Sequence, residues 1–217
     1  MTSTSTPAST NTADTSDHWE QVYRTRPSDE VSWYRPHLER SLSFIQAASP
    51  DHHARILDVG GGASTLVDDL VAQGYQNLSV LDLAEAALQQ ARDRLGESAS
   101  AVKWISADVR TVSFDSHSID LWHDRAVFHF LTDEADRASY VRQVTAALKP
   151  GGHLVIATFA PDGPTRCSGL EVVRYDATGL AQVFGQAFRL EAQAADAHTT
   201  PNGNTQSFVY CRFVRVA

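Results

Sequence analysis

The stretch Arg55–Leu66 constrains the fold most, because a short apolar strand runs into three consecutive glycines and then into a helix. Ile56, Leu57 and Val59 form an apolar run that is typical of a strand buried on both faces. The glycines at 60–62 allow a tight turn and let the backbone approach a ligand closely. Apolar side chains then recur at helical spacing, so the turn opens onto a helix N-terminus with free N–H groups. The stretch therefore predicts an α/β domain with a nucleotide-type pocket.

The spacing of the glycines disfavours NAD or FAD as the ligand. A dinucleotide-binding loop that starts at Gly60 would have its third glycine at position 65, where this chain has Thr65. Asp82 follows the second expected strand, at the distance from the glycine loop where a carboxylate accepts hydrogen bonds from ribose hydroxyls. The other interpretation of Asp82 is that it caps the helix after it.

The composition fits one globular domain of 217 residues, with 42% hydrophobic and 20% charged side chains. The net charge is −8 and no long Lys/Arg cluster is present, which argues against a surface for duplex nucleic acid or an anionic membrane. Cys167 and Cys211 are too few for a secreted disulfide framework. No apolar run approaches the ~18 residues of a membrane helix. We expect a cytoplasmic monomer or homodimer.

The chain is expected to begin with a disordered tail and a helical segment. Residues 1–16 are mostly Ser and Thr and have too few apolar side chains to offset the entropy of ordering. Residues 17–217 form one domain, and its first part, residues 17–48, predicts one or two helices. The aromatic residues of that part pack in the core or form a lid over the pocket, and they are Trp19, Tyr23, Trp33 and Tyr34.

The later strands are expected at 118–122 for the fourth, 153–159 for the fifth, 188–195 for the sixth and 206–216 for the seventh. The residues at 196–204 are expected to form a hairpin loop, with its turn at Asn202-Gly203. Polar, charged and aromatic residues at 122–131 follow the fourth strand. Because ligands of open α/β sheets lie off the carboxyl ends of the strands, we expect this segment to face the reacting group.

The pattern Asp58-x-Gly60-x-Gly62 resembles the first motif of class I S-adenosylmethionine (SAM) methyltransferases, with Ser64 at the next alternate position. Ala107-Asp108 after the third strand resembles a later motif of that family. The resemblance implies a seven-stranded sheet of order 3-2-1-4-5-7-6 with the last strand antiparallel, and SAM as cofactor. It also implies these cofactor contacts: Asp58, Gly60, Gly61, Gly62, Ser64, Asp82, Leu83, Ala107, Asp108 and Val109.

Within the family, Asp124-Arg125 resembles an Asp-Arg/Lys-Gly element of thiopurine and tellurite methyltransferases and of some small lysine methyltransferases, with Ala126 in place of the glycine. A thiol acceptor needs a base or a cation close by, and the candidates are His123, Arg125 and His129. A lysine acceptor would need a carboxylate and aromatics, and the candidates are Asp124, Trp33 and Tyr34.

Some of these candidates also have structural interpretations. His129 alternates with apolar residues and is more typical of a packed, hydrogen-bonded histidine. Cys167 and His198 are weaker candidates for the acceptor site, and Cys167 has no evident base beside it. A metal site is not expected, because His123 and His129 are six residues apart and do not share a helix face.

The sequence thus predicts a SAM-dependent methyltransferase that acts on a small acceptor, with a thiol or another soft nucleophile preferred. One alternative is a protein-lysine N-methyltransferase, and a second is a non-catalytic SAM- or nucleotide-binding module.

Overall fold

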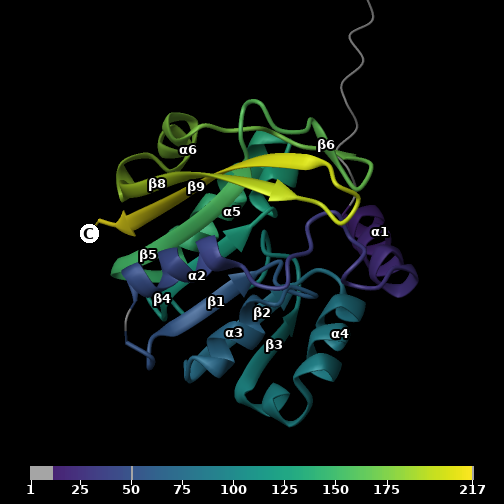
Figure 1. Ribbon diagram of the computed structural model, residues 1–217. Coiled ribbons are helices and arrows are strands. Elements are labelled where there is room, and N and C mark those ends of the chain that lie inside the picture. Colours follow the sequence, from purple (N-terminus) through teal and green to yellow (C-terminus); the bar gives the residue numbers. More distant parts are fainter. Residues whose placement is uncertain (1–11, 50, 217) are drawn as a thin grey trace, which may run out of the picture.

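The computed structural model describes residues 12–49 and 51–216, which are built around one seven-stranded sheet (Figure 1). In sheet order the strands are β3 (Val102–Ser106), β2 (Asn77–Asp82), β1 (Arg55–Val59), β4 (Ile119–Arg125), β5 (Leu148–Phe159), β9 (Thr205–Arg215) and β8 (Phe188–Thr199). Strands β1 to β5 are parallel, and β9 is antiparallel to both of its neighbours. The predicted fold class and strand order are confirmed.

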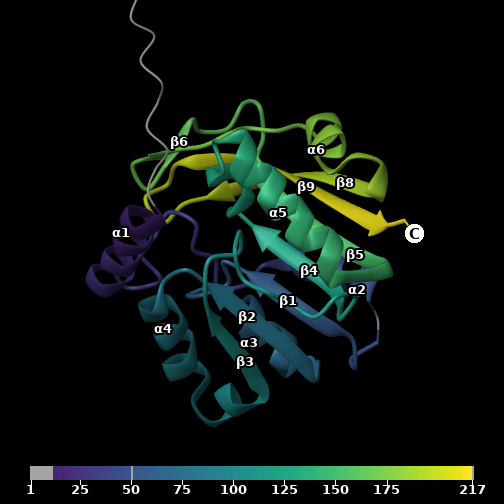
Figure 2. The same cartoon turned by 180° about the vertical axis from the view of Figure 1, so that it is seen from behind.

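The helices cover both faces of the sheet, which gives the molecule three layers. They are α1 (Thr12–Thr25), α2 (Glu39–Ala48), α3 (Leu66–Ala72), α4 (Glu85–Leu95), α5 (Glu134–Ala147) and α6 (Ala177–Phe184), with a short hairpin of β6 (Arg166–Cys167) and β7 (Leu170–Glu171). α2 and α3 lie on the face seen in Figure 1, and α5 crosses the other face in Figure 2.

Each face of the sheet has its own apolar core, because neighbouring residues of a strand point to opposite sides. In β4, Leu121 packs with α2, α3 and α4, whereas Trp122 packs with α5 and α6. In β5, Val155 packs in the same core as Leu121, and Leu154 packs in the same core as Trp122. Because both faces of the central strands are buried, the apolar residues of these strands form continuous runs.

Helix α1 lies outside these layers, beside α4 at the carboxyl edge of the strands (Figure 1). Tyr23 is buried in a small cluster with alanines of α4. Glu20 accepts a hydrogen bond from the backbone N–H of Ala86, and the Gln90 amide donates to the carbonyl of Tyr23. The N-terminal segment is therefore docked against the edge where the glycine loop ends β1.

The structure differs from the prediction at several element boundaries. β4 continues to Arg125, three residues beyond the expected end, and β8 continues to Thr199 through the first four residues of the expected loop. β5 begins at Leu148, five residues before the expected start at 153, and includes the sequence Pro150-Gly151-Gly152. The predicted tail, residues 1–16, lies outside the described residues up to position 11, and positions 12–16 belong to α1. No helix of the described residues has the length and apolarity to span a membrane.

Candidate functional site

The glycine loop is held between two carboxylates, those of Asp58 and Asp82. A Cβ at Gly61 would lie 2.2 Å from the Asp58 carboxylate, and one at Gly62 would lie 2.5 Å from Oδ2 of Asp82. Gly60 has φ +68°, and a Cβ there would overlap the side chain of Val127. Glycine is required at these positions because side chains already occupy the space around the turn.

Asp82 is tied to the loop by backbone donors. Its Oδ2 accepts from the N–H of Gly62 at 3.0 Å, and its Oδ1 accepts from the N–H of Ala84 at 2.9 Å. Burial raises the pKa of the Asp82 carboxyl to about 6, against the lowering effect of these hydrogen bonds. The side chain lines a pocket at the carboxyl ends of β1, β2 and β4.

This main pocket encloses about 1100 Å³, its open mouth included. Its walls include five of the predicted cofactor residues besides Asp82, namely Gly60, Leu83, Ala107, Asp108 and Val109. A smaller pocket beside it, under the N-terminal segment, is lined by Asp58, Gly60, Gly61 and Ser64. Gly62 lines neither pocket and contacts Asp82 instead. The predicted cofactor residues are thus gathered around two adjoining cavities.

Asp108 lies at the far end of the main pocket in a cluster of charges that the sequence did not predict. Arg110 donates to both carboxylate oxygens of Asp108 and to Asp136 on α5. These hydrogen bonds raise the pKa of the Arg110 guanidinium. The only sequence signal was the spacing Asp108-x-Arg110, which is too common to indicate a pair.

The other half of the main pocket is aromatic. Trp19, Tyr23 and Trp33 from the N-terminal segment meet Phe130, which follows β4. The ring centroids are 5.7 Å apart for Trp19 and Trp33, and 5.2 Å apart for Trp19 and Phe130. Three of the four predicted lid aromatics therefore line this pocket, whereas Tyr34 lines the smaller one.

Arg125 is the cation of the aromatic half. Its Nε donates to the hydroxyl of Tyr210 at 3.1 Å, and its Nη1 donates to the carbonyl of Trp33 at 3.1 Å. The guanidinium also lies 4.7 Å from the ring centroid of Phe208. Within the described residues, its Nη2 is buried without a hydrogen-bond partner, and no carboxylate forms an ion pair with it. A positive charge at the pocket is left without a protein counter-ion.

Asp124 and His123 lie inside β4 and not in a loop over the pocket, which corrects the expected contact of these residues with an acceptor. The Asp124 carboxylate accepts from the Tyr140 hydroxyl at 2.6 Å and from the N–H groups of Val127 and Phe128. Burial raises the pKa of Asp124 to about 6. This side chain fixes the turn that carries Arg125, and it does not line either pocket.

His123 is buried and both of its ring nitrogens have protein partners. Nδ1 lies 2.7 Å from Oδ1 of Asp58, and Nε2 lies 2.9 Å from the hydroxyl of Ser41. The ring contributes to the wall of the smaller pocket only. A direct base would need a free nitrogen facing the acceptor, so the geometry favours a positioning role.

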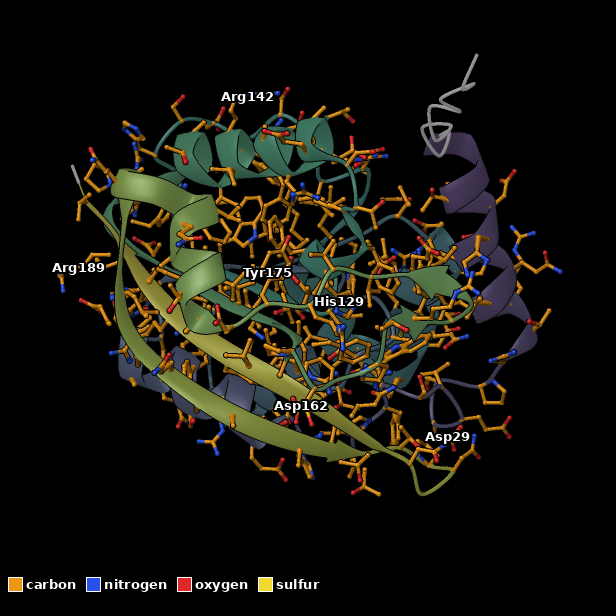
Figure 3. All side chains as sticks on the ribbon, turned by 90° about the horizontal axis from the view of Figure 1, so that it is seen from above. Asp29, His129, Arg142, Asp162, Tyr175 and Arg189 are labelled. Carbon is orange, nitrogen blue, oxygen red and sulfur yellow. The ribbon has the colours of Figure 1, made fainter. Side chains whose placement is uncertain are left out.

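His129, His198 and Cys167 do not form a catalytic group. His129 lies in the interior (Figure 3), outside both pockets, and burial lowers its pKa to about 3. His198 accepts from Arg35 and donates to the carbonyl of Ser32, so it joins the N-terminal segment to β8. Cys167 does line the main pocket, but burial raises its pKa to about 11, which disfavours a nucleophilic thiolate.

Comparison with known proteins places this geometry in a class. Residues 56–152 match a protein family described as a methyltransferase domain. The eEF1A lysine and N-terminal methyltransferase of Mus musculus is 25% identical over 150 residues, which are 69% of this chain and 21% of that protein. The chain thus spans about a fifth of the length of such relatives.

Solved structures share the fold over most of the chain. One, described as the conversion of a disulfide bond into a thioacetal group during echinomycin biosynthesis, has a TM-score of 0.73 at 16% identity, covering 93% of this chain and 91% of that one. The 1,6-didemethyltoxoflavin-N1-methyltransferase of Burkholderia thailandensis, with bound 1,6-didemethyltoxoflavin and S-adenosylhomocysteine, has a TM-score of 0.72 at 18% identity, covering 99% and 94%.

Residues 56–152 thus match a methyltransferase domain, and the solved structures that share the fold include SAM-dependent methyltransferases. The predictions of family, enzyme and cofactor are confirmed, and the alternative of a non-catalytic binding module is not retained. The acceptor is a separate question, because similar proteins named for lysine and for small-molecule methylation both occur.

Proposed function

We propose that this enzyme methylates a small acceptor that reacts as an anion, with a thiolate as the preferred nucleophile, in the aromatic half of the main pocket. The observation that carries the proposal is Arg125, whose guanidinium is part of the pocket wall and has no carboxylate partner among the described residues. A cation close to a thiol favours its thiolate form, and it disfavours the binding of an ammonium group.

The residues around the two pockets fit the cofactor. Oδ2 of Asp58 is buried without a hydrogen-bond partner in the described part of the chain, and Asp58 lines the smaller pocket, where the α-ammonium group of the cofactor would supply a donor. Asp82 would accept from the ribose hydroxyls, and Asp108 from the adenine amine. When bound, SAM supplies a methyl carbon activated by a positive sulfur.

The protein's own task in this reaction is to position the acceptor and exclude water. Arg125 would hold the acceptor's anionic sulfur, and Trp19, Trp33 and Phe130 would cover it. With SAM bound, the cofactor would supply the methyl group for the acceptor's sulfur, and the products would be a thioether and S-adenosylhomocysteine. The anion and the sulfonium neutralise one another, and no base is needed once the thiolate has formed.

The preference for sulfur is supported by the similar structure from echinomycin biosynthesis, which concerns the conversion of a disulfide bond into a thioacetal group. A protein-lysine acceptor remains the second candidate. It is favoured by the aromatic cluster, since aromatic faces attract cations, and by the name of the mouse relative.

The test is the formation of S-adenosylhomocysteine with two sets of acceptors. One set contains sulfide, methanethiol and an aromatic thiol, and the other contains lysine-bearing peptides and protein extract. We expect turnover with thiols. Arg125→Met should lower kcat/KM for thiols by about tenfold or more, the worth of a hydrogen-bonded charge, whereas Arg125→Lys should keep part of it. Turnover with the lysine set alone would reject the proposal.

A further inference from the structure

The smaller pocket and the main pocket are joined by a line of buried side chains that the proposed reaction does not use. Asp58 stands at one end and Arg125 at the other. Between them lie three side chains from three different elements: His123 on β4, Ser41 on α2 and Tyr210 on β9. All three are at most 1% exposed.

Four hydrogen bonds connect these five side chains. The distances are 3.1 Å from Nε of Arg125 to the Tyr210 hydroxyl, and 3.2 Å from there to the Ser41 hydroxyl. They are 2.9 Å from Ser41 to Nε2 of His123, and 2.7 Å from Nδ1 of His123 to Oδ1 of Asp58. The line of hydrogen bonds is continuous from the aromatic half of the main pocket to the glycine loop.

For a neutral His123 ring, the chemistry of the two ends sets the direction of every hydrogen bond. A guanidinium can only donate and a carboxylate can only accept. Tyr210 therefore accepts from Arg125 and donates to Ser41, and Ser41 donates to Nε2 of His123. His123 then donates from Nδ1 to Asp58, and its Nε2 is the acceptor for Ser41.

Both ends of the chain also have a free atom at a pocket. Oδ2 of Asp58 and Nη2 of Arg125 are buried and have no hydrogen-bond partner within the described residues. Each of these residues lines the smaller pocket, and Arg125 lines the main pocket as well. Oδ1 of Asp58 and Nε of Arg125 are held within this line of hydrogen bonds, and Nη1 of Arg125 is held by the Trp33 carbonyl, so the free atoms have fixed directions.

We propose that His123, Ser41 and Tyr210 are positioning residues that orient Asp58 toward the cofactor, through a directed hydrogen-bond chain anchored on Arg125. None of the three touches the reacting atoms. The inference concerns cofactor binding and holds for any acceptor, so it goes beyond the proposed function. It predicts that removing a hydroxyl two side chains away from Asp58 weakens binding of the cofactor product.

The test measures S-adenosylhomocysteine affinity by titration calorimetry for Tyr210→Phe, Ser41→Ala and the double variant. We expect each single variant to bind about threefold to tenfold more weakly, the range that one net hydrogen bond covers. The double variant should bind no more weakly than the weaker single variant. One substitution already interrupts the line of hydrogen bonds, so the second removes no further support from Asp58.

Tyr175→Phe is the matched control, since the Tyr175 hydroxyl is buried without a hydrogen-bond partner in the described structure. It should bind with wild-type affinity. Folded Tyr210→Phe and Ser41→Ala proteins with wild-type affinity would overturn the proposal, and so would losses that add in the double variant. The acceptor is absent from this experiment, so its outcome is independent of the thiol assignment.

A second measurement needs no substitution that could prevent folding. Heteronuclear NMR of the imidazole nitrogens of the wild-type protein should show His123 with its proton on Nδ1, and the Nε2 signal should respond to S-adenosylhomocysteine. A proton on Nε2 would reverse the hydrogen bond from Ser41 and would overturn the proposed direction.

Discussion

At the scale of single residues, the end of β4 shows how surroundings decide what an ionisable side chain does. His123 points into the layer of α2, where it meets the Ser41 hydroxyl, and Asp124 points to the opposite layer, where it meets Tyr140. Arg125 is the next residue along the strand and reaches the pocket. Strand alternation alone separates these neighbours into different environments.

Ala126 follows Arg125 with φ +71°, the left-handed conformation that favours glycine. We predict that Ala126→Gly keeps or raises the free energy of unfolding, by up to about 1 kcal/mol. The reason is that relief of about 1–2 kcal/mol of strain exceeds the entropy cost of glycine. The backbone hydrogen bond from Ala126 to Ala157 should be retained. Ala138→Gly, on the exposed side of α5, is the control and should cost about 1 kcal/mol in urea unfolding. Equal losses at both sites would contradict the strain argument.

His129 gives a prediction about acid stability. Its pKa is lowered to about 3 in the folded protein from the usual value of 6.5, because the ring is buried and Arg125 is near. The unfolded chain therefore binds more protons between these values, and stability falls as the pH falls. Between about pH 7 and about pH 5, wild type should lose about 2 kcal/mol more unfolding free energy than His129→Asn. An equal loss of unfolding free energy in wild type and His129→Asn would refute this prediction. The His129→Asn variant should keep its turnover, because His129 lines neither pocket.

The residues predicted to bind the cofactor gather at the two pockets more fully than those predicted for catalysis, and the reason is physical. Gly60, Asp82 and Asp108 lie at strand ends whose position follows from the apolar runs before them. The function of His123 depends on Ser41 and Tyr210, which are distant in sequence and have no local signal. Arg125 was predicted to be near the acceptor, and the structure places it at the pocket. Its missing counter-ion could be seen only from the packed structure.

At the scale of elements, the expected strands and most helices are present, and their lengths were harder to predict. β4 was expected to end at Trp122 because charged residues follow, yet it continues to Arg125 since those residues find partners in both layers. β8 was expected to end before Asp196, but its pairing with β9 extends to Thr199. A buried strand can therefore include polar side chains when each of them has a hydrogen-bond partner.

Helix α1 gives the prediction at this scale, because Trp19 and Tyr23 line the pocket while the helix touches the domain mainly at α4. We expect amide hydrogen exchange in residues 12–25 to slow several-fold when S-adenosylhomocysteine binds, since the ligand adds contacts to a helix with few of its own. α6 is the internal control, because none of its residues lines either pocket. Unchanged exchange in α1 would show that it is a fixed wall and not a lid.

At the scale of the whole molecule, the strand order came from the family resemblance and not from periodicity, because many orders satisfy the same apolar runs. One long-range link had no sequence signal at all. Arg35, ahead of α2, donates to His198 and pairs with Asp196 at 2.8 Å on β8. The His198 Nε2–H donates to the carbonyl of Ser32. The N-terminal segment is thereby joined to β8, an edge strand of the sheet.

This link can be tested by His198→Leu, which leaves Arg35 and the Ser32 carbonyl without their buried partner. One or two unsatisfied groups cost about 1–3 kcal/mol each, so we expect a Tm lower by several degrees and faster tryptic cleavage after Arg24. Arg189→Ala, at the other end of β8 (Figure 3), removes an exposed ion pair and should change stability by less than about 1 kcal/mol. If the N-terminal segment is held by α4 alone, cleavage in His198→Leu will be as slow as in the control. If His198 holds the segment to β8, cleavage will accelerate in that variant only, and S-adenosylhomocysteine will restore part of the protection.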